Sequence, residues 1–193
     1  EMFSKIEAPL GVYSILGNHD YGDYHHWTNP ADKVKNFEDL KGMHKRLGWD
    51  LLLNEHREVP FKSTYLNVVG VENYSASPRF PKYGDMVKAT EGMKRDTFNV
   101  LLSHDPSHWD DQVNKDYPEI DLTLSGHTHG FQFGVEIPGF MKWSPIQYVY
   151  PRWAGLYEKA SQYLYVNRGL GYLGYPGRVG ILPEITLLTL EQS

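Results

Sequence analysis

The sequence contains no cysteine. This absence excludes disulfide bonds and metal sites built from thiolates. The sequence also has no apolar run near the roughly 20 residues that a membrane-spanning helix requires, and no recognisable signal peptide. A reduced cytosolic protein and a cysteine-free secreted protein look alike in these respects, so cysteine usage leaves the compartment open.

Clusters of basic residues are also missing. The chain has 19 Lys and Arg against 24 Asp and Glu, a formal net charge of −5, and no run of Lys or Arg longer than two residues. Because nucleic-acid binders neutralise phosphates with clustered basic side chains, we expect no binding to nucleic acid. Any phosphate group bound here is expected to be held by metal ions and local hydrogen-bond donors.

The composition is that of a globular protein. Hydrophobic residues make up 40% of the 193 residues and charged residues 22%, which excludes general disorder. A chain of this length buries about 70% of the surface that it exposes when unfolded. We therefore expect one domain over residues 1–193.

Three predicted strands, residues 12–16, 98–102 and 120–124, each end in a polar turn. The three turns are Gly17-Asn18-His19-Asp20, Ser103-His104-Asp105 and Gly126-His127-Thr128-His129. In an open α/β sheet, ligands bind in the crevice outside the carboxyl ends of the strands. We therefore expect these turns to meet around one site, although they lie far apart in the sequence.

The residue types in these turns suit a binuclear metal centre. Neutral imidazole and oxygen ligands accept Zn, Mn or Fe, and a His-x-His pair can direct its two rings to adjacent ions. Two ions about 3.5 to 4 Å apart polarise a phosphoryl group and activate water near neutral pH. Taken singly, an Asn-His-Asp sequence after glycine is also an ordinary turn, and His104 alone could be a hydrogen-bonded partner. The occurrence of all three turns in one chain favours the metal site.

These turns resemble the third, fourth and fifth motifs of the calcineurin-like metallophosphoesterases, and the resemblance runs through nearly the whole chain. The stretch from Gly126 to Gly130, the Asn167-Arg168-Gly169-Leu170-Gly171 run and residues 183–188 resemble the YkuE-like branch of bacterial phosphohydrolases. Some members of that branch are similar to UDP-2,3-diacylglucosamine pyrophosphatases. The resemblance implies an α/β fold with a two-sheet αββα sandwich, and hydrolysis of phosphodiesters or phosphomonoesters with divalent ions (Mn, Fe, Zn or Mg).

The resemblance also implies the metal ligands. Asn18, His104 and His127 are expected to bind one ion and His129 the other. Phe131 stands where the branch usually has a second glycine, and we expect it to narrow the floor of the site or shift the backbone there.

The resemblance gives His19 the role of contacting the phosphate and protonating the leaving oxygen. Asp20 is expected to orient the His19 ring, because a carboxylate on the far nitrogen fixes the tautomer of an imidazole. Residues 21–29 form a loop rich in aromatic residues and histidine. His25 or His26 could reach a phosphate from this loop, or the loop could be an ordered surface segment.

The glycine-rich segment 167–178 resembles a loop near the metals in this branch. Arg168 or Arg178 could clamp a phosphate with two parallel hydrogen bonds, or both could be plain surface charges.

Two motifs of the family do not appear. An Asp-x-His and a Gly-Asp-x-x-Asp or Asn motif precede the Gly-Asn-His-Asp turn in the family, and they supply the bridging carboxylate and two further ligands. Here 16 residues precede Gly17, and none of them is aspartate or histidine. We therefore expect an N-terminally truncated chain without its first strands, which holds one metal ion or none and has impaired activity.

The expected truncation bears on partners and location. Uncovered sheet edges favour self-association, and a removed leader or anchor would allow membrane association. We expect a protein of the cytoplasm or of the cytoplasmic face of a membrane, acting on a small phosphoester, with a nucleotide-lipid as one option. The competing hypothesis is a degenerate, non-catalytic module that acts in protein interaction.

The remaining sequence predicts further elements. Asn29 and Pro30 begin a helix whose apolar stripe, from Val34 to Leu47, is expected in the core. His108 is expected to be exposed. The other predicted elements are a hairpin of residues 57–61 and 64–71 around Lys62-Ser63, helices from Asp85 and Pro106, a helical turn at Ser144-Pro145, and strands at 163–166 and 185–190.

Overall fold

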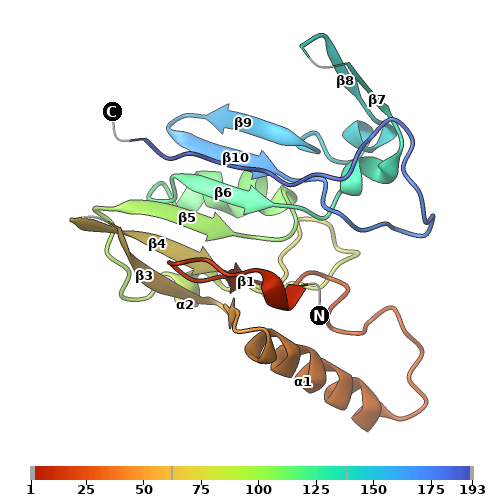
Figure 1. Ribbon diagram of the computed structural model, residues 1–193, viewed down its shortest axis with the longest axis horizontal. Helices are drawn as coiled ribbons and strands as arrows, with labels where there is room; N and C mark the ends of the chain where they lie inside the picture. Colours follow the sequence, from red (N-terminus) through yellow and green to blue (C-terminus); the bar gives the residue numbers. More distant parts are fainter. Residues whose placement is uncertain (1–2, 62, 138, 192–193) are drawn as a thin grey trace.

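The computed structural model describes residues 3–61, 63–137 and 139–191 (Figure 1). Lys62, one of the predicted turn residues of the hairpin, lies outside the described residues. The strands are β1 (Tyr13–Ser14), β2 (Asp50–Leu51), β3 (Glu55–Phe61), β4 (Thr64–Gly70), β5 (Phe98–Leu102), β6 (Leu122–Ser125), β7 (Val135–Ile137), β8 (Met141–Trp143), β9 (Gly155–Lys159) and β10 (Gln162–Val166). The helices are α1 (Pro30–Arg46), α2 (Met86–Ala89) and α3 (Asn114–Asp116), with a π-helical turn at Trp109–Val113 and 3₁₀ turns at Phe3–Lys5, His129–Gln132 and Pro145–Tyr148.

The main sheet has six strands in the order β3-β4-β5-β6-β10-β9. The four inner strands β4, β5, β6 and β10 are parallel, whereas β3 and β9 pair antiparallel at the two edges. Because the inner strands are parallel, their carboxyl ends lie at the same edge of the sheet. The turns that carry His104 and His127 leave the sheet at this edge.

One face of the sheet is covered by helices and holds the largest core. Strand residues such as Leu101 and Leu164 pack there against Trp109, Val113 and Met86, all of which are almost completely buried. The register places apolar residues of adjacent strands side by side, and alternate residues along each strand point to this face. This cluster fixes the position of β5 and β6, and therefore of the turns that follow them.

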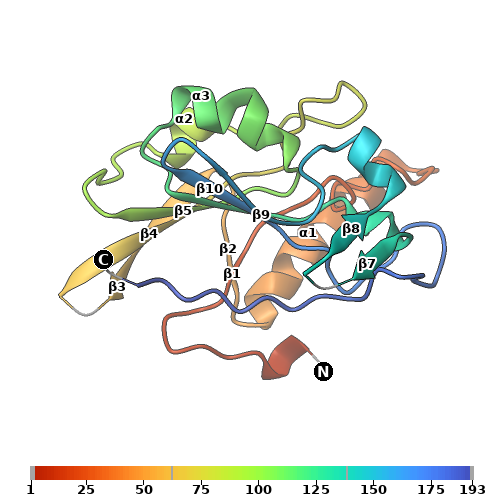
Figure 2. The same ribbon diagram turned by 90° about the horizontal axis from the view of Figure 1, so that it is seen from above.

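On the opposite face lie β1 and β2, which pair in parallel as a separate two-stranded sheet. Gly70 at the end of β4 allows this approach, since a Cβ there would lie 2.3 Å from Cβ of Leu52. Helix α1 follows β1 in sequence and contacts β2. The molecule is therefore layered. Helices α2 and α3 lie on one face of the six-stranded sheet, and the two-stranded sheet and then α1 lie on the other (Figure 2). The predicted α/β sandwich is confirmed.

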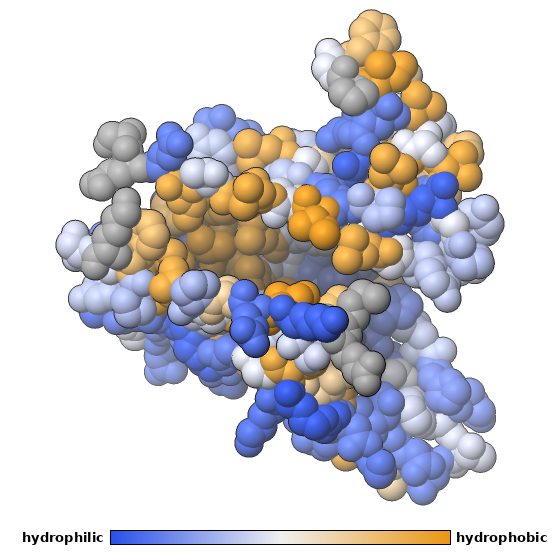
Figure 3. Space-filling view, viewed as in Figure 1, coloured by the Kyte–Doolittle hydropathy of each residue, from blue (hydrophilic) through white to orange (hydrophobic). Residues whose placement is uncertain are grey.

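The two-stranded sheet covers only part of this second face. Figure 3 shows a hollowed hydrophobic area over the six-stranded sheet. Phe98, Tyr163 and Leu156 are 37%, 39% and 60% exposed, although each belongs to a strand of this sheet. The sheet therefore presents apolar surface to solvent on this face.

The prediction that α1 buries an apolar stripe is wrong. No residue of α1 is buried, and Val34 is 63% exposed. The contacts of α1 are few and partly polar: it packs along β2, the Phe37 ring stacks on Tyr21 at 5.4 Å, and His44 hydrogen-bonds Ser14 at 2.9 Å. The predicted start of the helix is confirmed, since the Asn29 side chain accepts a hydrogen bond from the Ala31 N–H and Pro30 is the first helical residue.

Two further predictions are wrong. His108 is fully buried, because Ser103 and Gln112 hydrogen-bond its two ring nitrogens and Tyr74 stacks on its ring. Residues 185–190 do not form a strand. Their apolar side chains face solvent, and Ile185 is 87% exposed.

Two antiparallel pairings escaped the sequence analysis. β7 and β8 form a protruding hairpin, and β9 pairs with β10. Within the described ranges, none of the helices combines the length and the apolar character that crossing a bilayer requires.

Candidate metal centre

Three strand ends bring their polar turns into contact, as the sequence predicts. Asn18 comes from the turn after β1, His104 from the turn after β5 and His127 from the turn after β6. Gly17 lies directly against the His104 ring, since a Cβ at residue 17 would stand 2.7 Å from Cε1 of His104. The glycine is required for this close approach of the first and second of these turns.

Three atoms of the predicted ligands form a small triangle. Nε2 of His104 lies 2.9 Å from Oδ1 of Asn18, Nδ1 of His127 lies 3.2 Å from the same oxygen, and the two nitrogens are 3.1 Å apart. Adjacent ligands of an octahedral ion, each about 2.1 Å from the metal, are about 3 Å apart. The triangle therefore has the dimensions of one face of an octahedral coordination shell.

The amide of Asn18 is oriented by a second contact. Its Nδ2 group donates to the hydroxyl of Tyr24 at 2.9 Å. Because the nitrogen side is engaged in this way, the carbonyl oxygen Oδ1 faces the two histidines. Asn18 is 2% exposed, so this oxygen is available only to groups inside the site.

The far nitrogen of His127 is also engaged. Nε2 lies 2.8 Å from the hydroxyl of Tyr150 and 3.6 Å from Oδ2 of Asp105. The ring of Phe80 meets the His127 ring edge-on, with the centroids 5.0 Å apart. Residues 144–150, 72–84 and 103–107 therefore enclose the turn that carries His127.

All three histidine rings are uncharged at neutral pH. Burial, and then the neighbouring His127, lower the pKa of His104 to about 3, with Asp105 opposing the shift. Burial is also the main reason why the pKa of His127 lies below its usual range, with Asp105 opposing the shift. The pKa of His129 is lowered by burial and then by the charge of Arg178. The uncharged imidazole is the form that binds a metal ion.

His129 lies in a strained turn next to the triangle. The backbone has positive φ at His127, His129, Gly130, Phe131 and Gln132. Only one of these five is glycine, and non-glycine residues with positive φ are uncommon and cluster at functional sites. Nδ1 of His129 is buried without a hydrogen-bond partner among the described residues. This nitrogen is the expected donor for a further ion.

Phe131 departs from the usual glycine at a position where glycine is favoured. Its φ is 55°, and its side chain is 53% exposed. The ring therefore stands at the rim of the site and does not fill its floor.

The predicted catalytic pair lies at the entrance. His19 is exposed, and its ring packs on that of Tyr24 with the centroids 4.6 Å apart. Asp20 uses Oδ2 to accept the backbone N–H of Gly17 at 2.7 Å. The carboxylate therefore holds the Gly17–Asp20 turn in shape, and His19 is presented to solvent next to Asn18 in the sequence.

His25 and His26 are both exposed. The ring of His25 packs edge-on against Trp27, whose indole N–H donates to the carbonyl oxygen of Gly22 at 2.7 Å. The loop is therefore an ordered segment packed partly by its own rings.

The two arginines have acceptors within the protein. Arg168 pairs with Glu184 at 2.6 Å and with Glu136. Arg178 donates to the carbonyl oxygens of Arg168 and Gly171 at 2.9 and 2.7 Å. Both guanidinium groups thus hold the glycine-rich loop together in the structure.

The donor set fits one divalent ion. One amide oxygen and two imidazole nitrogens converge, and all are neutral ligands that Mn, Fe or Zn accept. Over the residues that the structure covers, no three His, Cys, Asp or Glu side chains are grouped so that they could hold a metal ion. Among the residues that the structure describes, the predicted ligands therefore include no carboxylate that could bridge two ions.

Sequence reasoning missed Tyr24, Phe80 and Tyr150, which contact Asn18 or His127. The aromatic loop that contains Tyr24 was a visible signal. Phe80 and Tyr150 lie in irregular segments without a motif, so only the fold reveals them.

Comparison with known proteins gives a consistent family. Residues 1–131 match the family model described as calcineurin-like phosphoesterase. The chain is 34% identical over 200 residues to a "Transmembrane protein with metallophosphoesterase domain" of Danio rerio, covering 100% of this chain and 41% of that protein. It is 32% identical over 196 residues to the "Uncharacterized metallophosphoesterase YkuE" of Bacillus subtilis, covering 100% and 60%.

A third relative carries a specific name. The chain is 30% identical over 210 residues to the "UDP-2,3-diacylglucosamine pyrophosphatase LpxG" of Chlamydia trachomatis, covering 86% of this chain and 60% of that protein. The chain thus spans 41% to 60% of the length of these three relatives. No solved structure gave a significant match.

Proposed function

We propose, because this chain belongs to the calcineurin-like phosphoesterase family and to its YkuE-like branch, that it hydrolyses phosphoester bonds with a divalent metal ion. The observation that carries the proposal is the triangle of Asn18 Oδ1, His104 Nε2 and His127 Nδ1, with edges of 2.9 to 3.2 Å. These three residues would hold the ion. When bound, such an ion polarises a phosphoryl oxygen and makes water a better nucleophile near neutral pH.

The residues around the triangle have distinct tasks in this proposal. Asn18, His104 and His127 bind and orient, and their neutral side chains leave the positive charge of the ion available to an anionic phosphate. His19 lies at the entrance, where it donates a proton to the leaving oxygen. Asp20 secures this arrangement by fixing the turn through the Gly17 N–H.

We also infer that these 193 residues hold at most one ion and are weak catalysts by themselves. The support is chemical. The triangle supplies three neutral donors, His129 supplies one more nitrogen, and no cluster of three His, Cys, Asp or Glu occurs in the part of the chain that the structure describes. A second ion held by His129 alone would lack the carboxylate that normally balances its charge.

The proposal is tested by measuring metal content and hydrolysis of bis-p-nitrophenyl phosphate with added Mn²⁺. We expect about one ion per chain, slow turnover, and loss of both in His127→Ala. His19→Ala should keep the ion and lose turnover. Two ions bound to the unaltered chain would contradict the one-ion inference, and turnover that survives both substitutions would refute the assigned roles.

The alternative is a non-catalytic module that acts in protein interaction. The exposed apolar side chains on the open face of the main sheet, among them Leu156 and Tyr163, favour it. Under this alternative the chain associates with itself or a partner and shows no turnover at any Mn²⁺ concentration. Sedimentation at two protein concentrations, run beside the hydrolysis assay, separates the two functions.

A nucleotide-lipid pyrophosphate is the more specific substrate that we propose. The name of the chlamydial relative supports it. So do exposed apolar residues near His129. A Cβ at residue 171 would lie 3.7 Å from Cε1 of His129, and the neighbours of Gly171, Leu170 and Tyr172, are 58% and 64% exposed. A lipid-linked nucleotide diphosphate should then be cleaved faster than a nucleotide diphosphate without acyl chains, and equal rates would refute this preference.

A further inference from the structure

Tyr150 and Asp105 form a hydrogen-bonded chain behind His127. The Tyr150 hydroxyl lies 2.8 Å from Nε2 of His127 and donates to Oδ2 of Asp105 at 3.1 Å. The other carboxylate oxygen of Asp105 accepts the backbone N–H of Ser107 at 2.8 Å. Asp105 is 1% exposed, so these protein groups are its partners.

The direction of this chain follows from counting protons. A carboxylate only accepts hydrogen bonds, so the single hydroxyl proton of Tyr150 goes to Asp105. The oxygen of Tyr150 is then left as an acceptor toward His127, and Nε2 of His127 must carry the ring proton. In the neutral ring, Nδ1 is consequently unprotonated and presents its lone pair to Asn18 and His104.

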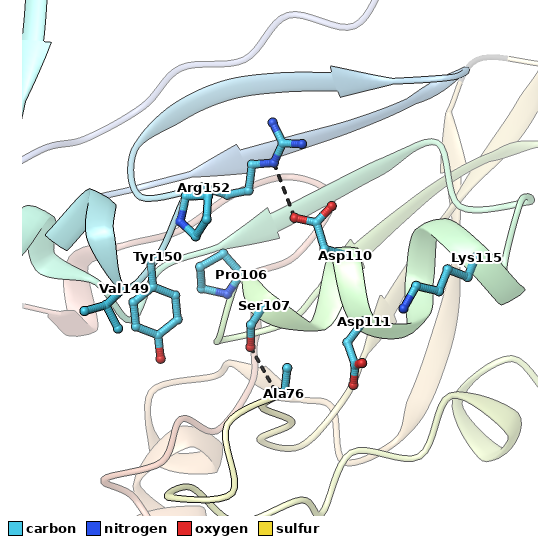
Figure 4. A pocket seen from close by; sticks show the side chains of 10 residues that line it. Ala76, Pro106, Ser107, Asp110, Asp111, Lys115, Val149, Tyr150 and Arg152 are labelled. Atoms are coloured by element: carbon cyan, nitrogen blue, oxygen red, sulfur yellow. Dashed lines mark hydrogen bonds and ion pairs between the residues drawn. The ribbon is translucent and has the colours of Figure 1, made fainter.

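Tyr150 is a necessary intermediary in this arrangement. The direct separation of 3.6 Å between Nε2 of His127 and Oδ2 of Asp105 is too long for a hydrogen bond. Tyr150 also lines a hollow of about 280 Å³, and its hydroxyl points away from the Arg152–Asp110 pair on the other side of that hollow (Figure 4). One side of Tyr150 thus borders the hollow while its hydroxyl reaches the histidine.

We propose that Tyr150 and Asp105 are positioning residues that hold His127 in the Nε2–H tautomer and so keep Nδ1 available for a metal ion. This inference rests on the proposed function for its purpose, but the tautomer itself is a property of the metal-free chain. Partners behind a ligating histidine fix its tautomer and ring orientation, and their loss typically weakens metal binding 10- to 100-fold.

The first test uses the metal-free, unaltered chain. Long-range ¹H–¹⁵N NMR spectra distinguish a protonated ring nitrogen from an unprotonated one, and they should show His127 protonated at Nε2 alone. A ring protonated at Nδ1, or an equal mixture of tautomers, overturns the proposal whether or not the protein hydrolyses any phosphoester.

The second test uses two substitutions and a matched control. Tyr150→Phe keeps the ring but removes the hydroxyl. Asp105→Asn should direct its NH₂ group at Tyr150, so that the Tyr150 hydroxyl donates to His127 and the direction of the hydrogen bonds is reversed. Tyr148→Phe removes a hydroxyl from a residue that is 78% exposed and two positions away. We expect both site variants to lose the single tautomer and to bind Mn²⁺ 10- to 100-fold more weakly, with the control unchanged.

The outcomes separate this inference from the proposed function. If the unaltered chain shows the Nε2–H tautomer and Tyr150→Phe loses it, the positioning role stands even if neither protein turns over substrate. If Tyr150→Phe keeps both the tautomer and the Mn²⁺ affinity, the positioning role is refuted even if the unaltered chain is an active enzyme. Near-UV circular dichroism of each variant establishes that the fold is retained.

Discussion

Gly17 lies against the ring of His104 so closely that a Cβ at residue 17 would stand 2.7 Å from its Cε1. The two residues come from the turns after β1 and β5, which belong to different sheets. This contact brings Oδ1 of Asn18 to 2.9 Å from Nε2 of His104. A missing side chain therefore sets the first edge of the candidate metal triangle.

Gly17→Ala should displace His104 and abolish Mn²⁺ binding, because the added methyl group and the ring cannot occupy the same space. Titration of Mn²⁺ by calorimetry measures the loss. Gly42→Ala in α1 is the matched control, since a Cβ there meets only the flexible end of Arg46 at 3.2 Å. The control should bind normally. Wild-type affinity in Gly17→Ala would show that His104 is not a ligand in this position.

His129→Ala should leave binding of the first Mn²⁺ ion nearly unchanged, within about threefold, because His129 is outside the triangle of Asn18, His104 and His127. The comparison variant His127→Ala should lose that ion. Metal content after gel filtration measures both. Equal loss in the two variants would mean that His129 shares the first ion.

The buried His108 predicts a pH dependence of stability. Burial lowers its pKa in the folded protein to about 4, with Gln112, Asp105 and Asp111 opposing the shift. The unfolded chain takes up this proton at the ordinary pKa near 6.5. The stabilisation is therefore complete above about pH 6.5 and is lost as the pH falls toward about 4.

Urea unfolding between pH 7 and 4.5 measures this effect. The free energy of unfolding should fall with a slope that approaches about 1.4 kcal/mol per pH unit for the proton of His108. In His108→Gln one fewer proton is taken up on unfolding, so the slope should be smaller by up to about 1.4 kcal/mol per pH unit. An unchanged slope in this variant would show that His108 does not titrate in the predicted way.

Arg178→Ala distinguishes a structural role from a phosphate clamp. Its guanidinium donates to several carbonyl oxygens of the glycine-rich loop, and removal should cost about 1.5 to 3 kcal/mol of stability and expose the loop to proteolysis. Inhibition by inorganic phosphate should not change. Arg79→Ala, at an exposed residue of another loop, is the control. If Arg178→Ala stays stable but is no longer inhibited by phosphate, the hypothesis that Arg178 clamps a phosphate is supported instead.

The sequence by itself determined the strand ends and the residue types of the site. The predicted strand at 98–102 and the hairpin of β3 and β4 were correct, because alternating apolar residues with glycine or polar breaks are local signals. The convergence of His104 and His127 was also predictable, since the parallel neighbours β5 and β6 deliver their carboxyl ends to one edge. Asn18 follows β1 of the two-stranded sheet, so its place beside them depended on how the two sheets pack.

Tertiary structure alone decided which apolar and polar side chains are buried and what lies behind the ligands. Residues 185–190 and the α1 stripe have sequence patterns that fit a core, yet none of their side chains is buried. Tyr150 reaches His127 from an irregular segment with no motif. Sequence patterns report local conformation, whereas such contacts depend on how separate segments pack, and only the folded chain supplies that information.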